Sequence, residues 1–148
     1  MFCVPIIDVY HNGFWNYRDK LISKNKSRTF IYDAYQERNS SSIGLKSIFK
    51  SRPILPHGLH GIHVSDAAVI GHNVVIMQNV TIGSNTLSNT KNPGAPTIGD
   101  NVFFGANSTV IGKVYIGDNC RIGAGCCVFK DVPSNHTIVS GRGNIIPH

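Results

Sequence analysis

The chain has 148 residues, of which 41% are hydrophobic and 15% charged, and its formal net charge is +6. This length predicts one domain whose core needs no disulfide staples, and the composition excludes a disordered chain. No run of 18 apolar residues is present, so we expect no membrane span. The start, MFCVPIIDVYHNGFW, lacks the features of a signal peptide. Four cysteines without a C-x-x-C pair favour a cytoplasmic protein with free thiols.

The first 52 residues are predicted to form a short helical cap. The stretches RDKLISKNK and RTFIYDAYQER have approximate apolar faces, and NSSS (39–42) reads as a break. This segment has nine Lys and Arg against four Asp and Glu, or +5, whereas residues 53–148 have five against four, or +1. A basic segment can attract polyanions. Because no known nucleic-acid motif is present, we interpret the charge as a solvated helical face and expect no nucleic-acid partner.

A cluster of histidines follows the cap. Four of the seven histidines of the chain fall within sixteen residues: His57, His60, His63 and His72. Imidazoles can transfer protons near neutral pH, bind metals or fill structural positions. The cluster by itself does not decide among these roles.

A repeat of six residues begins at residue 64 with VSDAAV, IGHNVV and IMQNVT, and it resumes at residue 98 after an interruption. The first position is apolar throughout: Val64, Ile70, Ile76, Ile82, Ile98, Phe104, Val110, Ile116, Ile122 and Val128. The fifth position is small or β-branched: Ala68, Val74, Val80, Val102, Ser108, Val114, Cys120, Cys126 and Val132. A period of six fits neither an α-helix nor a heptad coiled coil, and it is typical of a parallel β-helix.

In such a fold each group of six residues forms one side of a triangular coil, and the coils stack on one another. The first position fills the interior, and the fifth position fits the corner. Cys120 and Cys126 are therefore predicted to be buried packing thiols, and Cys127 is predicted to point outward. We assign residues 53–148 to this domain, with the cap covering one open end.

The interruption of the repeat predicts a loop. Ile82 and Ile98 are sixteen residues apart instead of six, and the extra residues lie in a stretch rich in Ser, Asn, Thr, Pro and Gly. We expect residues 84–97 to leave one corner of the coil. A loop on a rigid scaffold is a frequent place for binding groups.

The repeat region, residues 55–146, resembles the hexapeptide-repeat acyltransferases, and within them the serine acetyltransferase-like branch that includes O-acetyltransferases of polysaccharide clusters. The resemblance is carried by LPHGLHGIHVS (55–65), QNVTIGSNTL (78–87), GAPTIGDNVFFGANSTVIG (94–112) and IGAGCCVFKDVPSN (122–135). It implies an all-β fold, a left-handed parallel β-helix of hexapeptide repeats with a short N-terminal helical cap. It also implies a homotrimer that binds acetyl-CoA, and no metal, between neighbouring β-helices.

The resemblance further implies a histidine general base that takes the proton of an acceptor hydroxyl while that oxygen attacks the thioester. In the polysaccharide-cluster relatives the histidine just before Gly matches His60, which we favour, with His57 second. Counting back from Gln78 with the spacing of typical serine acetyltransferases instead aligns their catalytic histidine with Gly58, which lies next to His57. For His63 a structural role is expected, and for His72 an exposed side chain.

The cofactor contacts implied by the resemblance are Lys130 near the CoA end, Ala106 and Ala124 along the pantetheine arm, and Arg142, which replaces a family arginine aligned with Asn144. The sequence also departs from serine acetyltransferases. Residues 94–97 read GAPT where those enzymes have an Asp-Arg-His-Pro-type stretch, and residues 43–55 contain no aspartate to orient the base.

From these departures we expect an acetyl-CoA-dependent O-acetyltransferase whose acceptor is a sugar of a surface polysaccharide or its precursor. The alternative is serine O-acetylation. A γ-carbonic anhydrase-type hydratase shares the fold, but its zinc needs an H-x4-H pair, and no two histidines here are five apart. A binding module without chemistry is the fourth hypothesis, because a fold alone does not define a function.

Overall fold

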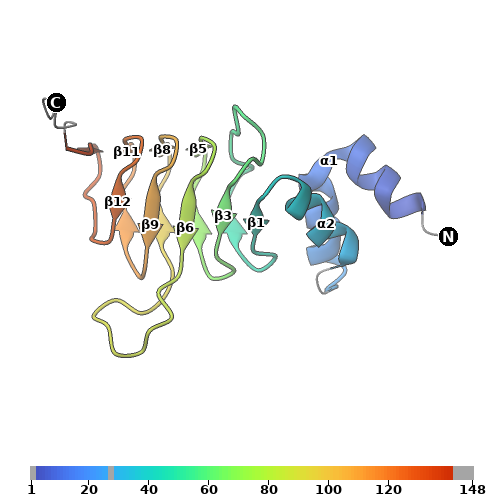
Figure 1. Ribbon diagram of the computed structural model, residues 1–148, viewed down its shortest axis with the longest axis horizontal. Helices are drawn as coiled ribbons and strands as arrows, with labels where there is room; N and C mark the ends of the chain where they lie inside the picture. The colour runs from blue at the N-terminus through green and yellow to red at the C-terminus, as the bar shows by residue number, and fades with distance from the viewer. Residues whose placement is uncertain (1–2, 27–28, 142–148) are drawn as a thin grey trace, which may run out of the picture.

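The protein is a left-handed parallel β-helix with two helices at its N-terminal end, as the computed structural model shows for residues 3–26 and 29–141 (Figure 1). The predicted fold class is confirmed. None of the helices in these described ranges is both long and apolar enough to span a bilayer.

Three parallel sheets form the sides of the β-helix, and the chain passes through them in the order A, B, C within each coil. Sheet A contains β1 (Ser42–Ile43), β3 (His63–Val64), β6 (Thr81–Gly83), β9 (Thr109–Ile111) and β12 (Cys127–Val128). Sheet B contains β2 (Ile48–Phe49), β4 (Val69–Ile70), β7 (Thr97–Ile98) and β10 (Tyr115–Ile116). Sheet C contains β5 (Val75–Ile76), β8 (Phe103–Phe104), β11 (Arg121–Ile122) and β13 (Thr137–Ile138).

The alternation along each strand explains the repeat. The second residue of each strand points inward, and Ile70, Ile82 and Phe104 are fully buried. The small fifth positions line the corners, where Cys120 and Cys126 are buried while Cys127 is exposed, as predicted. Burying an aliphatic side chain in this way contributes about 1.5–3 kcal/mol to the free energy of folding.

One column of corners is stabilised by asparagines. Asn73, Asn101, Asn119 and Asn135 all adopt the left-handed conformation, with φ of 54°, 57°, 58° and 64°. Asparagine tolerates this conformation better than most residues. Their side-chain amides bond from coil to coil at 3.3, 3.2 and 3.1 Å. The column therefore satisfies polar groups at the bend between sheets B and C.

The first coil begins earlier than the repeat suggested, because β1 and β2 pair with β3 and β4. Ile43, Phe49 and Leu55 are spaced by six, as first positions should be. The next first position, Val64, lies nine residues after Leu55 instead of six. These three inserted residues interrupt the period of six, so the repeat is not visible in the sequence before residue 64. The division between residues 52 and 53 thus stays a prediction, although paired strands start at Ser42.

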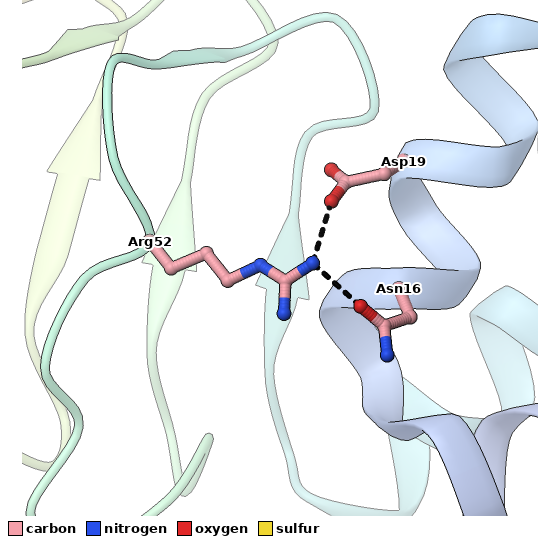
Figure 2. Close-up of polar contacts among 3 residues, drawn as sticks. All are labelled: Asn16, Asp19 and Arg52. Atoms are coloured by element: carbon pink, nitrogen blue, oxygen red, sulfur yellow. Dashed lines mark hydrogen bonds and ion pairs between the residues drawn. The ribbon is translucent and has the colours of Figure 1, made fainter.

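The cap consists of α1 (Cys3–Ser23), kinked at Gly13, and α2 (Phe30–Arg38). The hydroxyl of Tyr32, which is fully buried, donates to the carbonyl of Ile43 in β1 (2.9 Å). At the surface, Arg52 donates to Asp19 (2.9 Å) and Asn16 (2.6 Å) of α1 (Figure 2). The cap is therefore joined to the first coil by buried and exposed contacts.

Candidate active site

Sheet A carries the candidate site, because irregular segments leave the β-helix at both of its edges. The chain enters sheet A from sheet C at the C–A corner, and there it forms the histidine turn, residues 55–62. It leaves sheet A toward sheet B at the A–B corner, and there it forms the loop 84–96. Figure 1 shows the green histidine turn above β3 and the yellow loop below β6.

The histidine turn is held by its backbone and by one buried side chain. Leu59 is 7% exposed and packs into the core. The N–H of Gly61 donates to the carbonyl of Asn39, at the end of α2 (3.0 Å). Gly58 and Gly61 have φ of +67° and +66°, a conformation in which glycine carries no steric cost. The turn is therefore an ordered extension of the corner.

Both candidate bases, His57 and His60, lie on this turn with exposed side chains. Neither ring has a hydrogen-bond partner among the described residues. The backbone of His60 is fixed to the next coil, because the N–H of Asn79 donates to its carbonyl (3.0 Å). Both imidazoles can thus meet a substrate from solvent at the same edge of sheet A.

The other two histidines of the cluster lie elsewhere. His63 is the outward residue of β3, on the face of sheet A. His72 is exposed at the corner between sheets B and C, where its backbone N–H donates to Asp100 (2.8 Å). The structure therefore brings His63 near the histidine turn and separates His72 from it.

A pocket of about 230 Å³ lies on the face of sheet A, between His63 and the residues that lead into the A–B corner. It is lined by Ser42, His63, Val64, Ser65, Thr81, Ile82 and Gly83. Ser42 and Thr81 lie on either side of His63 in the strand register. Sequence reasoning missed this row, although residues 63 and 81 are eighteen apart, which is one coil of three sixes. The insertion in the histidine turn shifts Ser42 out of that spacing.

Ala106 and Ala124 extend the C–A corner beyond the histidine turn. Backbone N–H groups connect the corner from coil to coil: Asn107 donates to Gln78 (3.1 Å), and Gly125 donates to Ala106 (2.9 Å). Ala106 is half-buried and Ala124 is exposed. The structure therefore aligns these two predicted cofactor contacts with the turn that carries His60.

Lys130 lies at the opposite edge of sheet A, at the A–B corner after β12. It lines a second pocket of about 310 Å³ with Phe129 and Asp131, and its ammonium lies 6.0 Å from the centre of the Phe129 ring. The three predicted cofactor contacts that the structure describes, Ala106, Ala124 and Lys130, thus do not form one cluster. Arg142 lies outside the residues that the structure describes.

The loop 84–96 is ordered at its base by its own backbone. Asn85 and Gly94 exchange two backbone hydrogen bonds of 2.8 Å each, and the Asn85 amide donates to Thr90 (2.7 Å). The carbonyl of Asn92 accepts from Lys113 in the next coil (3.2 Å). The loop is therefore attached to the A–B corner of sheet A.

No group of three or more His, Cys, Asp or Glu side chains that could hold a metal occurs within residues 3–26 and 29–141.

Comparisons with known proteins agree with this fold. Residues 95–130 match the family model described as bacterial transferase hexapeptide (six repeats). A serine acetyltransferase of Synechococcus elongatus is 39% identical over 92 residues, which cover 62% of this chain and 36% of that protein. One of Staphylococcus epidermidis is 38% identical over 95 residues, covering 64% of this chain and 43% of that protein. The chain thus spans less than half the length of these relatives.

Solved structures show the same similarity over more of the chain. A serine acetyltransferase of Neisseria gonorrhoeae in complex with serine superposes with a TM-score of 0.69 at 30% identity, covering 86% of this chain and 52% of that one. Native serine acetyltransferase 1 of Entamoeba histolytica superposes with a TM-score of 0.71 at 27% identity, covering 86% of this chain and 49% of that one.

These comparisons correct the predicted acceptor. The prediction of a polysaccharide sugar is wrong, because the matched relatives and structures are serine acetyltransferases, one of them with serine bound. Sequence reasoning gave too much weight to residues 94–97, where the arginine and histidine of that branch are absent. Those residues lie at the end of a loop, and loops vary most among related proteins.

Proposed function

We propose that this chain, a hexapeptide-repeat protein with serine acetyltransferases among its relatives, transfers an acetyl group from acetyl-CoA to the hydroxyl of L-serine. The observation that carries the proposal is the superposition on a serine acetyltransferase with bound serine, which extends over 86% of this chain. It is supported by the two exposed imidazoles of the histidine turn, which leads directly into β3, and by a small pocket on the face of sheet A.

In the proposed reaction His60 is the general base, with His57 the second candidate. The imidazole takes the proton of the serine hydroxyl, while the hydroxyl oxygen bonds to the thioester carbonyl carbon. The tetrahedral oxyanion then collapses, the C–S bond breaks, and the leaving CoA thiolate takes up the proton. A base is needed because an alcohol is a poor nucleophile near neutral pH. The exposure of both imidazoles supports this role.

For acetyl-CoA we propose a site between two copies of the chain in a homotrimer. Ala106 and Ala124 continue the C–A corner above the histidine turn, and Lys130 lies at the other edge of the same sheet. Two copies packed edge to edge would bring the small residues of one copy to the lysine of the other. Small side chains let an extended arm run close to the wall, and an ammonium attracts phosphates. We place the reaction in the cytoplasm, consistent with free thiols.

The test measures the release of CoA, by titration of its free thiol, when purified protein and acetyl-CoA are mixed with L-serine. We expect release well above the rate without acceptor, and O-acetylserine as the product by mass spectrometry. L-alanine, which has no hydroxyl, is the matched control and should leave the background rate unchanged. If L-serine also leaves it unchanged while the protein still binds CoA, the proposal is wrong.

A further inference from the structure

We propose that the pocket around His63 is the subsite that holds the carboxylate of the acceptor amino acid, with His63 as its main binding residue. This inference rests on the proposed function and adds a specificity residue to it. L-serine carries a carboxylate whichever histidine acts as the base, and an enzyme that prefers it needs donors for that group.

Donor groups line the pocket in a row. Ser42, His63 and Thr81 face one another across three adjacent strands of sheet A. Neighbouring strands are about 4.8 Å apart, so two or three of these side chains can reach one carboxylate. Ser65, the next outward residue after His63, adds a hydroxyl that shares a hydrogen bond with Ser84 at the base of the loop. Each of these four side chains can donate a hydrogen bond.

The charge of the pocket also suits an anion. Its lining contains no acidic side chain, and His63 is its titratable residue. The neighbouring carboxylate, Asp66, accepts a hydrogen bond from the backbone N–H of Lys46 (3.1 Å) and belongs to the A–B corner. A hydrogen bond to a charged group such as a carboxylate is stronger than one between neutral groups.

The size of the pocket suits a small acceptor. Its volume of about 230 Å³ is below the range of roughly 300–1,000 Å³ that is usual for drug-sized ligands. Gly83 lines the pocket without a side chain, and a Cβ at this position would lie 2.7 Å from the side chain of Ile111. A pocket of this size is large enough for a small molecule such as an amino acid.

The position relative to the histidine turn fits a bound serine. His60 and His63 are three residues apart, so their Cα atoms are separated by at most about 11 Å. Imidazoles on residues at this separation can contact one small molecule that lies between them. A serine held by its carboxylate at His63 thus has its hydroxyl within reach of the turn.

The experiment compares L-serine with L-serinamide, which lacks the carboxylate, in the wild type, His63→Ala, His63→Gln and the control His72→Ala. We expect His63→Ala to raise the KM for L-serine at least tenfold, with kcat and the KM for acetyl-CoA changed less than threefold. His63→Gln, which keeps a hydrogen-bond donor, should raise the KM for L-serine less than His63→Ala does. In the wild type the KM for L-serinamide should be higher than the KM for L-serine, and His63→Ala should leave the KM for L-serinamide unchanged. His72→Ala should match the wild type.

Thermal unfolding of each variant checks the fold, and amide chemical shifts of residues 63–65 and 81–83 during titration with L-serine report the pocket directly. An unchanged KM for L-serine in His63→Ala, or an equal KM rise for both substrates, would overturn the carboxylate site while serine acetylation stands. A wild type that neither binds nor acetylates L-serine would overturn both proposals.

Discussion

At the scale of single residues, the site depends on what a three-residue insertion places at one corner. Leu55 and Val64 are nine residues apart instead of six, and His57 and His60 stand in the added length. A regular corner would have no room for an exposed turn of this kind. The insertion therefore creates the place where the proposed chemistry occurs.

The two candidate bases can be separated by substitution. We expect His60→Ala to lower kcat for serine acetylation by about 10²–10⁴, the usual contribution of a general base, with little change in the free energy of unfolding because the side chain is exposed. Thiol titration under saturating substrates measures the effect. If His60→Ala keeps full turnover and His57→Ala loses it, the base is His57.

Two glycines of the histidine turn form a matched pair. Both have positive φ, so an alanine at either one costs about 1–2 kcal/mol of backbone strain. A Cβ at Gly61 would also lie 2.0 Å from the amide oxygen of Asn79, whereas at Gly58 the nearest atom, on His60, is 3.9 Å away. We therefore expect Gly61→Ala to destabilise the protein more than Gly58→Ala in chemical denaturation. Equal losses would mean that the Asn79 side chain moves aside without cost.

At the scale of elements, the joint between the cap and the first coil rests on a buried arginine. Arg18 of α1 is 4% exposed, and its guanidinium donates to the carbonyls of Gly44 (3.3 Å), Leu45 (3.1 Å) and Ser47. It also lies 5.1 Å from the centre of the Phe49 ring of β2. The Gly44 carbonyl also accepts from the Ser47 hydroxyl (2.6 Å), whereas the carbonyls of Leu45 and Ser47 accept from no group other than Arg18 among the described residues.

We expect Arg18→Met to lower the free energy of unfolding by about 2–4 kcal/mol, because it leaves buried carbonyls unsatisfied. Arg52→Ala is the control: it removes the exposed pair with Asp19, both side chains being 55% exposed, and should cost less than about 1 kcal/mol. Urea denaturation at one fixed protein concentration compares them. Similar losses would show that the cap does not depend on the buried contact.

At the scale of the whole molecule, the separation of Lys130 from the C–A corner predicts a site shared between copies. We expect a mass in solution of about three times the 16.1 kDa chain by light scattering. Mixing His60→Ala with Lys130→Ala under conditions that exchange subunits should restore part of the activity, since some interfaces then receive both intact residues. A monomeric active enzyme, or no recovery on mixing, would contradict the shared site.

How much the sequence could predict differs between the coil and its surroundings. The repeat predicted the β-helix, the inward thiols of Cys120 and Cys126 and the loop after β6, because each depends on a local period of six. It did not predict β1 and β2, whose register is interrupted, nor the row formed by Ser42, His63 and Thr81. The acceptor was predicted incorrectly, because it was inferred from residues missing in the variable loop at 94–97 and in the segment 43–55.

The sequence by itself determined that the chain winds into stacked coils, since the pattern of inward and outward side chains recurs every six residues. It also determined that histidines gather before the regular repeat. Only the tertiary structure decided which side chains share a face, because coils bring together residues eighteen or more positions apart, and any insertion changes that separation. It thereby placed His63 beside Ser42 and Thr81, and Lys130 at the opposite edge of sheet A from His60.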